Sequence, residues 1–113
     1  MSFSITTNQV RNQTKTVTRR LGWWKLKPGD VVCAVEKGMG LKKGEKVKHI
    51  CQLRIISVRK EPLFRVTDLE CIKEGFPKLT PVEFMRMFKA SHRCEFHTVV
   101  NRIEFEYVSS TSS

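Results

Sequence analysis

Runs of apolar and β-branched residues, separated by charged and Gly- or Pro-containing segments, indicate the strands of this chain. The clearest run is residues 98–108, where Phe105 and Tyr107 alternate with Glu104 and Glu106, as in a strand with one buried face. Four further runs predict strands over residues 3–5, 16–20, 31–36 and 47–60. We therefore expect five strands.

Three Thr-x-x-Gln/Glu sequences predict where helices begin. In such a capping box the threonine accepts a hydrogen bond from the backbone three residues on, and the Gln or Glu reaches back. The threonines concerned are Thr6, Thr67 and Thr80. The helices expected after them span residues 7–13, 68–74 and 81–91.

The last of these helices should pack on the core, because Val82, Met85 and Phe88 recur at helical spacing. Pro81 suits its first position. Gly75 marks the end of the helix before it, since glycine readily adopts the left-handed conformation that stops a helix.

The order of these elements predicts an α+β fold, a small and mostly antiparallel β-barrel with helices packed against it. The chain has 113 residues, 40% of them hydrophobic, which is enough for one compact domain. We expect that domain over residues 1–108. The Ser/Thr tail, residues 109–113, is expected to be disordered.

The charge of the chain suggests what kind of partner it meets. Lys and Arg number 21 against 11 Asp and Glu, a net charge of +10. This excess favours an anionic partner such as RNA, and the alternative is a basic surface that serves solubility alone. Residues 38–44, "GMGLKKG", lack the Gly-Lys-Ser/Thr ending of a phosphate loop and are expected to connect two strands.

No apolar run approaches the length of a membrane span, so no membrane partner is expected. The first ten residues lack the features of a secretory signal, and a cytoplasmic location is expected. The four cysteines form no Cys-x-x-Cys pair and are expected to be reduced thiols, several of them in the core.

A metal site is weighed and set aside. His92, Cys94 and His97 lie within six residues of one another, but the fourth ligand and the usual zinc spacing are missing. The alternative, which we favour, is the polar end of a helix and its loop. No metal and no other cofactor are expected.

The segment "TKTVTRRLGWW", residues 14–24, combines basic residues, threonines and two tryptophans. Neighbouring residues of an extended segment face opposite ways, so one of Trp23 and Trp24 is expected to fill the core while the other covers a pocket. A flat ring over a pocket can stack on a nucleobase. The alternative is that both tryptophans only pack.

The same segment belongs to a longer pattern. "QTKTVTRRLGWWKLKPGDVVCAVEKG", "LECIKEGFPKLTPVEFMRMF" and "RIEFEYV", in this order and spacing, resemble ASCH domains, small proteins with a PUA-like barrel. The resemblance extends from about Ser2 to Val108. Members of the family are linked to RNA binding, and the chain is most similar to the branch that hydrolyses the acyl-amide of N4-acylated cytidines.

The resemblance implies a catalytic set of Lys15, Thr18 and Glu74. In this interpretation Lys15 deprotonates Thr18, whose oxygen attacks the amide carbonyl to form an acyl-threonine, and Glu74 protonates the departing amino group. Arg20 would orient the site or contact a sugar or carbonyl oxygen, with Trp23 and Trp24 also binding substrate. Alternatively, Arg20 only pairs with a carboxylate such as Glu74.

This chemistry places conditions on the structure. A lysine acts as a base only when neutral, and burial or the nearby charges of Arg19, Arg20 and Lys25 would lower its pKa. In a regular strand Lys15 and Thr18 would face opposite sides, so Lys15 must precede the strand. Glu74, in the last helical turn, is expected to have a raised pKa because the helix dipole disfavours negative charge there.

Two rival functions remain open. The first is a non-catalytic module that binds RNA or a modified nucleobase through the same pocket and basic surface. The second, less favoured, is a ribonuclease, because the sequence shows neither the pair of histidines nor the cluster of carboxylates that would support one. The sequence leaves the oligomeric state and the acyl-group range undetermined.

Overall fold

The computed structural model describes residues 1–37 and 43–108. The expected disordered tail, and all but the last two residues of the "GMGLKKG" connection, lie outside the described residues. The helices are α1 (Thr7–Arg11), α2 (Asp68–Lys73) and α3 (Pro81–His92), with one 3-10 turn at Leu63–Arg65. The strands are β1 (Val17–Arg20), β2 (Val31–Val35), β3 (His49–Pro62) and β4 (Val99–Tyr107).

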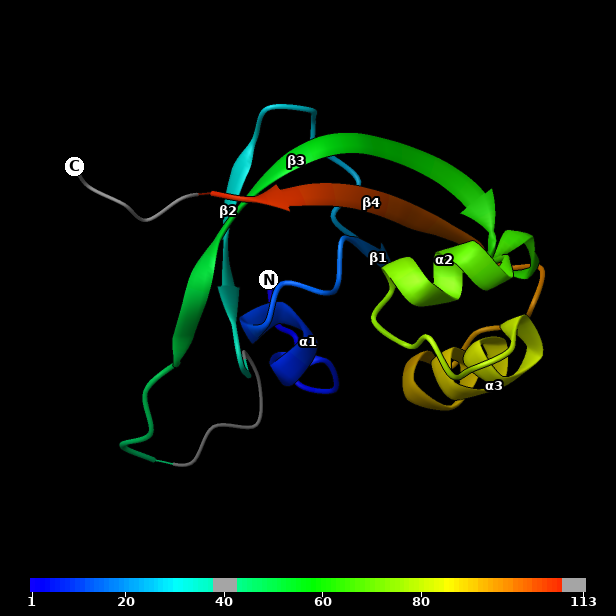
Figure 1. Ribbon diagram of the computed structural model, residues 1–113, viewed down its shortest axis with the longest axis horizontal. Coiled ribbons are helices and arrows are strands. Elements are labelled where there is room, and N and C mark those ends of the chain that lie inside the picture. Colours follow the sequence, from blue (N-terminus) through cyan, green and yellow to red (C-terminus); the bar gives the residue numbers. More distant parts are fainter. Residues whose placement is uncertain (38–42, 109–113) are drawn as a thin grey trace.

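The strands form one antiparallel sheet in the order β1-β4-β3-β2, curled into a half-barrel (Figure 1). The long strand β3 bends along its length, and its register against β4 shifts between Ile55 and Ser57. Such an irregularity increases the local twist and lets a sheet curl. The predicted α+β class with a mostly antiparallel barrel is confirmed.

The strand expected over residues 3–5 is not formed. Ser2 instead makes one isolated parallel bridge to Val35, and the amide of Phe3 donates to the Val35 carbonyl at 2.9 Å. The hydroxyl of Thr7 then donates to the Phe3 carbonyl at 2.6 Å, where the chain turns into α1. The early turn into a helix leaves too few residues for a strand.

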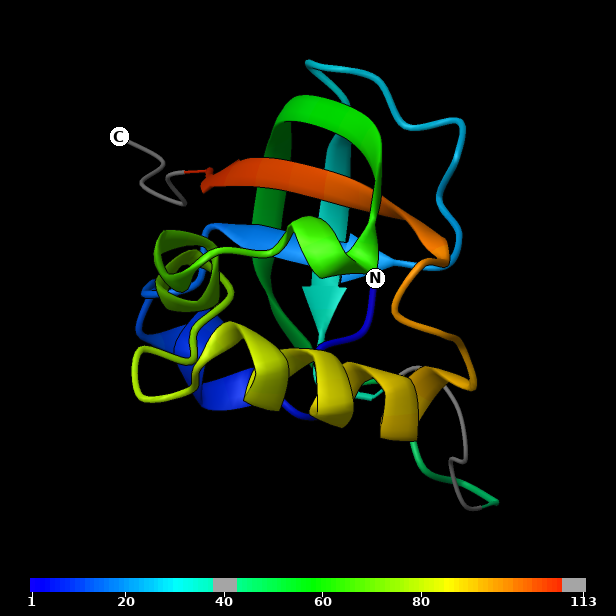
Figure 2. The ribbon, with the colours of Figure 1, turned by 90° about the vertical axis from the view of Figure 1, so that its right-hand side faces the viewer.

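The helices cover the sheet from one side. Figure 2 shows α3 running beneath the strands, and α2 packs against it. One apolar cluster joins α3 to the sheet, and its buried members are Leu63, Val66, Cys71, Phe84, Met85, Phe88, Cys94 and Val100. A second cluster fills the half-barrel with Phe3, Val10, Ala34, Leu53, Ile55, Ile103 and Phe105. All four cysteines are free thiols, and Cys71 and Cys94 are core residues as expected.

The three predicted capping boxes have different outcomes. Thr80 of α3 forms the complete box with Glu83. Thr67 accepts from the Glu70 amide, but the Glu70 side chain bonds arginines instead of reaching back. Thr6 makes no side-chain cap bond, and α1 is correspondingly short, ending at Arg11 rather than at residue 13.

The buried face of α3 differs by one residue from the prediction. Val82 is 46% exposed, whereas Phe84, Met85 and Phe88 are buried. The i,i+4 pair of phenylalanines sets the centre of the apolar face, and Val82 lies off it. Within the part of the chain that the structure describes, no helix has the length and apolar character needed to cross a membrane.

Candidate active site

A cavity of about 170 Å³ opens between the N-terminal segment, β1, the end of α2 and α3. One wall carries polar side chains, namely Lys15, Thr18, Arg19, Arg20 and Glu74. A second, largely aromatic wall comes from Phe76 and from the α3 residues Phe84, Met87, Phe88 and His92. The three residues implied as catalytic, and Arg20 with them, therefore line one cavity.

Lys15 lies in irregular backbone just before β1, which begins at Val17. Its own amide donates to the Gln9 carbonyl at 3.3 Å, and the Thr16 amide donates to the Lys73 carbonyl at 2.8 Å. The hydroxyl of Tyr107 donates to the Lys15 carbonyl at 2.6 Å. The segment is thus fixed from α1, α2 and β4, and the condition that Lys15 precede the strand is met.

Lys15 and Glu74 form a buried ion pair. The ammonium donates to Glu74 Oε1 and to the Glu74 backbone carbonyl, each at 2.7 Å, and both side chains are at most 4% exposed. Burial lowers the pKa of Lys15, the contact with Glu74 opposes that shift, and the charges of Arg20 and Arg19 lower it further. Lys25, expected to contribute as well, is exposed.

Glu74 is held from its other side by Arg19, whose Nη1 donates to Oε2 at 2.9 Å. Arg19 continues into a buried network with Glu70 at 2.7 Å and Glu61 at 3.3 Å. The guanidinium paired with Glu74 therefore belongs to Arg19, and the pairing considered for Arg20 is wrong. Arg19 contacts the carboxylates, whereas Arg20 bonds Thr18, and both arginines line the cavity.

Arg20 is a cation that uses only one of its N–H groups in a hydrogen bond to another described residue. Its Nε donates to Thr18 Oγ1 at 3.1 Å, and its guanidinium lies over the Phe3 ring, 4.7 Å from the centroid. Burial lowers the pKa of Arg20 to about 10, so it stays charged at neutral pH. Within residues 1–37 and 43–108 it has no ion-pair partner, and its remaining N–H groups are available to a ligand.

The described residues contain no hydrogen bond between Lys15 Nζ and Thr18 Oγ1. Both side chains are buried and line the same cavity, but the lysine is engaged with Glu74 and the threonine with Arg20. Lys15 and Thr18 are therefore not bonded to each other, although the implied chemistry pairs them.

The tryptophans lie elsewhere. Trp23 is 44% exposed and Trp24 45%, so the expectation that one fills the core is wrong. Trp23 has a φ of 61°, and this left-handed residue breaks the extended alternation on which that expectation rested. Neither belongs to the described residues that line the cavity. Lys60 Nζ lies 5.6 Å from the centre of the Trp24 ring.

The aromatic wall was missed by sequence reasoning. Phe84, Phe88 and His92 are spaced four residues apart on α3, a pattern typical of a core-facing stripe, and nothing in it distinguishes a cavity wall from packing. His92 was weighed as a metal ligand with Cys94 and His97 and was interpreted instead as part of the polar end of a helix, and α3 does end at His92. No group of three ligating side chains occurs among the described residues, and Cys94 is buried in the core.

Comparison with known proteins finds no matching family model and no matching curated protein. Among solved structures the chain is similar to a protein of Enterococcus faecalis V583, of the family model DUF984, with a TM-score of 0.60 and 21% identity. It is also similar to an ASCH domain of Lactobacillus crispatus JV V101, with a TM-score of 0.59 and 17% identity. The fold is ASCH-like.

The similarity covers 90% of this chain and 66% of the Enterococcus protein. For the Lactobacillus domain the corresponding shares are 91% and 70%. The chain thus spans about two thirds of the length of the Enterococcus protein. At these identities the likeness establishes the fold alone, and the chemistry has to be argued from this chain's own side chains.

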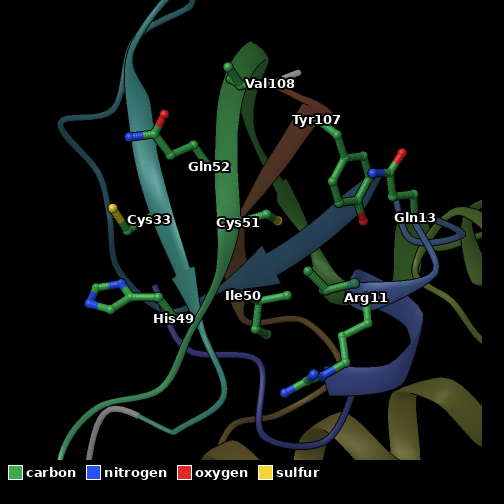
Figure 3. Close-up of a pocket in the computed structure, with 10 residues that line it drawn as sticks. Arg11, Gln13, Cys33, His49, Ile50, Cys51, Gln52, Tyr107 and Val108 are labelled. Carbon is green, nitrogen blue, oxygen red and sulfur yellow. The ribbon is translucent and has the colours of Figure 1, made fainter. Parts of the chain in front are cut away.

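A second and larger hollow of this ASCH-like fold, about 980 Å³, is lined by residues of α1, β2, β3 and the end of β4 (Figure 3). Its lining includes Arg11, Gln13, Cys51 and Tyr107 but none of the polar residues of the first cavity. The side chains of Cys33 and His49 point away from Tyr107 in this view. We therefore place the candidate active site in the smaller cavity, where the buried ionisable groups converge.

Proposed function

We propose that this protein is an amidohydrolase that removes the acyl group from N4-acylated cytosine nucleosides such as N4-acetylcytidine. The observation that carries the proposal is the buried pair of Lys15 and Glu74, 2.7 Å apart, in a cavity that Thr18 also lines. The resemblance of the sequence to the amidohydrolase branch supplies the substrate class. A cytoplasmic location is part of the proposal.

The Lys15–Glu74 pair can supply a base and an acid together. Burial disfavours charge, and it lowers the pKa of Lys15. When a bound substrate excludes water, transfer of one proton from the ammonium to the carboxylate leaves a neutral amine and a neutral carboxylic acid. The amine is then a base for the Thr18 hydroxyl, and the acid is a proton donor for the leaving group.

The reaction then proceeds in two balanced steps. Thr18 Oγ1 attacks the amide carbonyl and gives its proton to Lys15, the C–N bond breaks, and the cytosine amino group leaves with the proton from Glu74. Water next hydrolyses the acyl-threonine ester, releases the carboxylic acid and restores the hydroxyl. The first step requires Lys15 to turn from Glu74 toward Thr18, while the free N–H groups of Arg20 stabilise the developing oxyanion.

Release of cytidine from N4-acetylcytidine tests the proposal. Lys15→Met, Thr18→Val and Glu74→Gln should each lower kcat by about a hundredfold or more, since each removes a group that moves a proton or forms the bond. Thr16→Val is the matched control, because Thr16 is the neighbouring threonine outside the cavity lining. Thermal melting of each variant separates loss of chemistry from loss of folding.

Two outcomes would change the proposal. Turnover that survives Thr18→Val would replace the acyl-threonine with direct attack by water. Absence of turnover by the wild type on every acylated cytosine tried would contradict the amidohydrolase and favour a binding module.

A second candidate function, RNA binding, is favoured by one observation outside the cavity. Trp24 is half exposed with Lys60 over its ring, and the chain carries a net charge of +10. Exposed aromatic rings among basic residues can stack on unpaired bases. RNA affinity through such a surface should fall steeply with salt, whereas turnover of an uncharged nucleoside should be nearly independent of it.

A further inference from the structure

His92, the last residue of α3, lines the same cavity as Lys15 and Thr18. Its ring stacks on Phe88, one helical turn earlier, with 4.2 Å between centroids and 19° between planes. Phe88 is buried and cannot easily move. The orientation of the imidazole is therefore set by α3 itself.

The hydrogen bond of His92 fixes which ring nitrogen carries the proton. Nδ1 lies 3.1 Å from the Phe88 carbonyl oxygen. A carbonyl oxygen only accepts, so Nδ1 must donate, and Nε2 of the neutral ring is left as an acceptor. Nε2 has no hydrogen-bond partner within the residues that the structure describes.

The side-chain acceptors of Glu74 and Thr18 are already engaged, while Ser2, Ser4 and Thr6 also line the cavity. The two carboxylate oxygens of Glu74 already receive bonds from Lys15 and Arg19, and the Thr18 hydroxyl receives one from Arg20. Arg20 still has unused N–H groups that can donate. A ligand that offers oxygens to Arg20 and a single N–H to His92 therefore matches these polar groups.

We infer that His92 Nε2 accepts the amide N–H of the substrate and selects secondary over tertiary acyl-amides. The inference rests on the proposed function, because an N4-acylcytosine carries one such N–H between its acyl group and the ring. An N-methylated acyl-amide keeps the carbonyl oxygens but has no hydrogen to donate. A site built around a hydrogen bond discriminates strongly against an analogue that cannot form it.

The test compares N4-acetylcytidine with N4-acetyl-N4-methylcytidine at pH 8, using wild type, His92→Phe and His92→Gln. His92→Phe keeps a ring on Phe88 but removes the acceptor, and His92→Gln restores an acceptor oxygen. His97→Phe is the matched control, since His97 is exposed and outside the cavity lining. Because His92 is itself exposed, the variants should fold normally.

For the secondary amide, His92→Phe should raise KM about tenfold with kcat nearly unchanged, and His92→Gln should recover most of the loss. For the N-methylated substrate, His92→Phe should change nothing. An unchanged KM for the secondary amide, or an equal loss on both substrates, would overturn the inference while leaving the amidohydrolase in place.

Calorimetric titration with N4-acetylcytidine separates the inference from the proposed function. If the wild type binds this nucleoside without hydrolysing it, the amidohydrolase proposal fails. The inference then stands if His92→Phe weakens binding about tenfold and falls if it does not. If the wild type does not bind the nucleoside at all, both are overturned.

Discussion

Glu74 owes its position to the residue after it. Gly75 has a φ of 97°, a left-handed conformation that ends α2 and turns the chain back under Lys15. A Cβ at this position would lie 2.9 Å from Gln9 Cγ, and Gln9 also donates from Nε2 to the Gly75 carbonyl at 3.3 Å. The close approach of α1 to the segment that carries Glu74 therefore requires glycine.

Gly75→Ala is expected to lower both stability and turnover. The left-handed backbone alone disfavours alanine by about 1–2 kcal/mol, and the contact with Gln9 adds to that. Gly22→Ala is the control, because a Cβ at Gly22 meets no atom within 4 Å. Chemical denaturation and cytidine release measure the two effects. Equal stability of the two variants would show that α1 yields and that Gly75 does not position Glu74.

The adjacent arginines show how far single residues can be anticipated. Strand alternation implies that Arg19 and Arg20 differ in their contacts, but not which of them meets a carboxylate. That choice depends on Glu70 and Glu61, which come from α2 and from the far end of β3. Only the folded chain brings these residues together, so the sequence offered Arg20, and not Arg19, as the alternative partner of Glu74.

Among the elements, α3 is the one whose local sequence carries most information. Thr80, Pro81 and Glu83 together determine where it starts, and all three act locally as the pattern predicts. The same kind of pattern at Thr6 fails, because Gln9 bonds Gly75 across the fold instead of reaching back. Boundaries set by neighbours in sequence are predictable, and those decided by tertiary contacts are not.

Thr80→Ala is expected to destabilise the protein by about 1 kcal/mol, the usual contribution of an N-cap side chain. Thr80 Oγ1 accepts from the Glu83 amide at 3.2 Å, and Glu83 Oε1 accepts from the Thr80 amide at 2.9 Å. Ser91→Ala on the same helix removes only a bond back to the Met87 carbonyl and should be neutral. Equal unfolding free energies for the two variants would contradict the role of the cap.

At the scale of the molecule, buried charges link the sheet to the helices. Glu70 of α2 receives hydrogen bonds from Arg19 of β1 and Arg102 of β4, and Arg19 also reaches Glu61 of β3. The same arginine holds Glu74 in the cavity. The network that closes α2 onto three strands is therefore continuous with the candidate catalytic pair, and loss of its charges should affect folding and site together.

Acid should weaken the protein through Glu70 in particular. Hydrogen bonds from Arg102 and Arg19 lower the pKa of Glu70 to about 2, against 4.5 for an ordinary glutamate. A carboxyl whose pKa is depressed in the folded state stabilises it fully above pH 4.5, and that contribution disappears as the pH falls toward 2. The difference in pKa corresponds to roughly 3 kcal/mol. Unfolding free energies measured between pH 7 and pH 2 should show this decline.

Glu70→Gln separates this contribution from general acid effects. The variant should be less stable by about 3–5 kcal/mol at pH 7, because two buried guanidinium groups each lose a carboxylate partner. As the pH falls toward 2, the variant should lose less additional stability than the wild type does. Glu106→Gln is the control, since Glu106 pairs with Arg54 while about half exposed and should change stability little. If Glu70→Gln and the wild type lose stability in parallel as the pH falls, the acid sensitivity arises from other carboxylates, and the network has only a packing role.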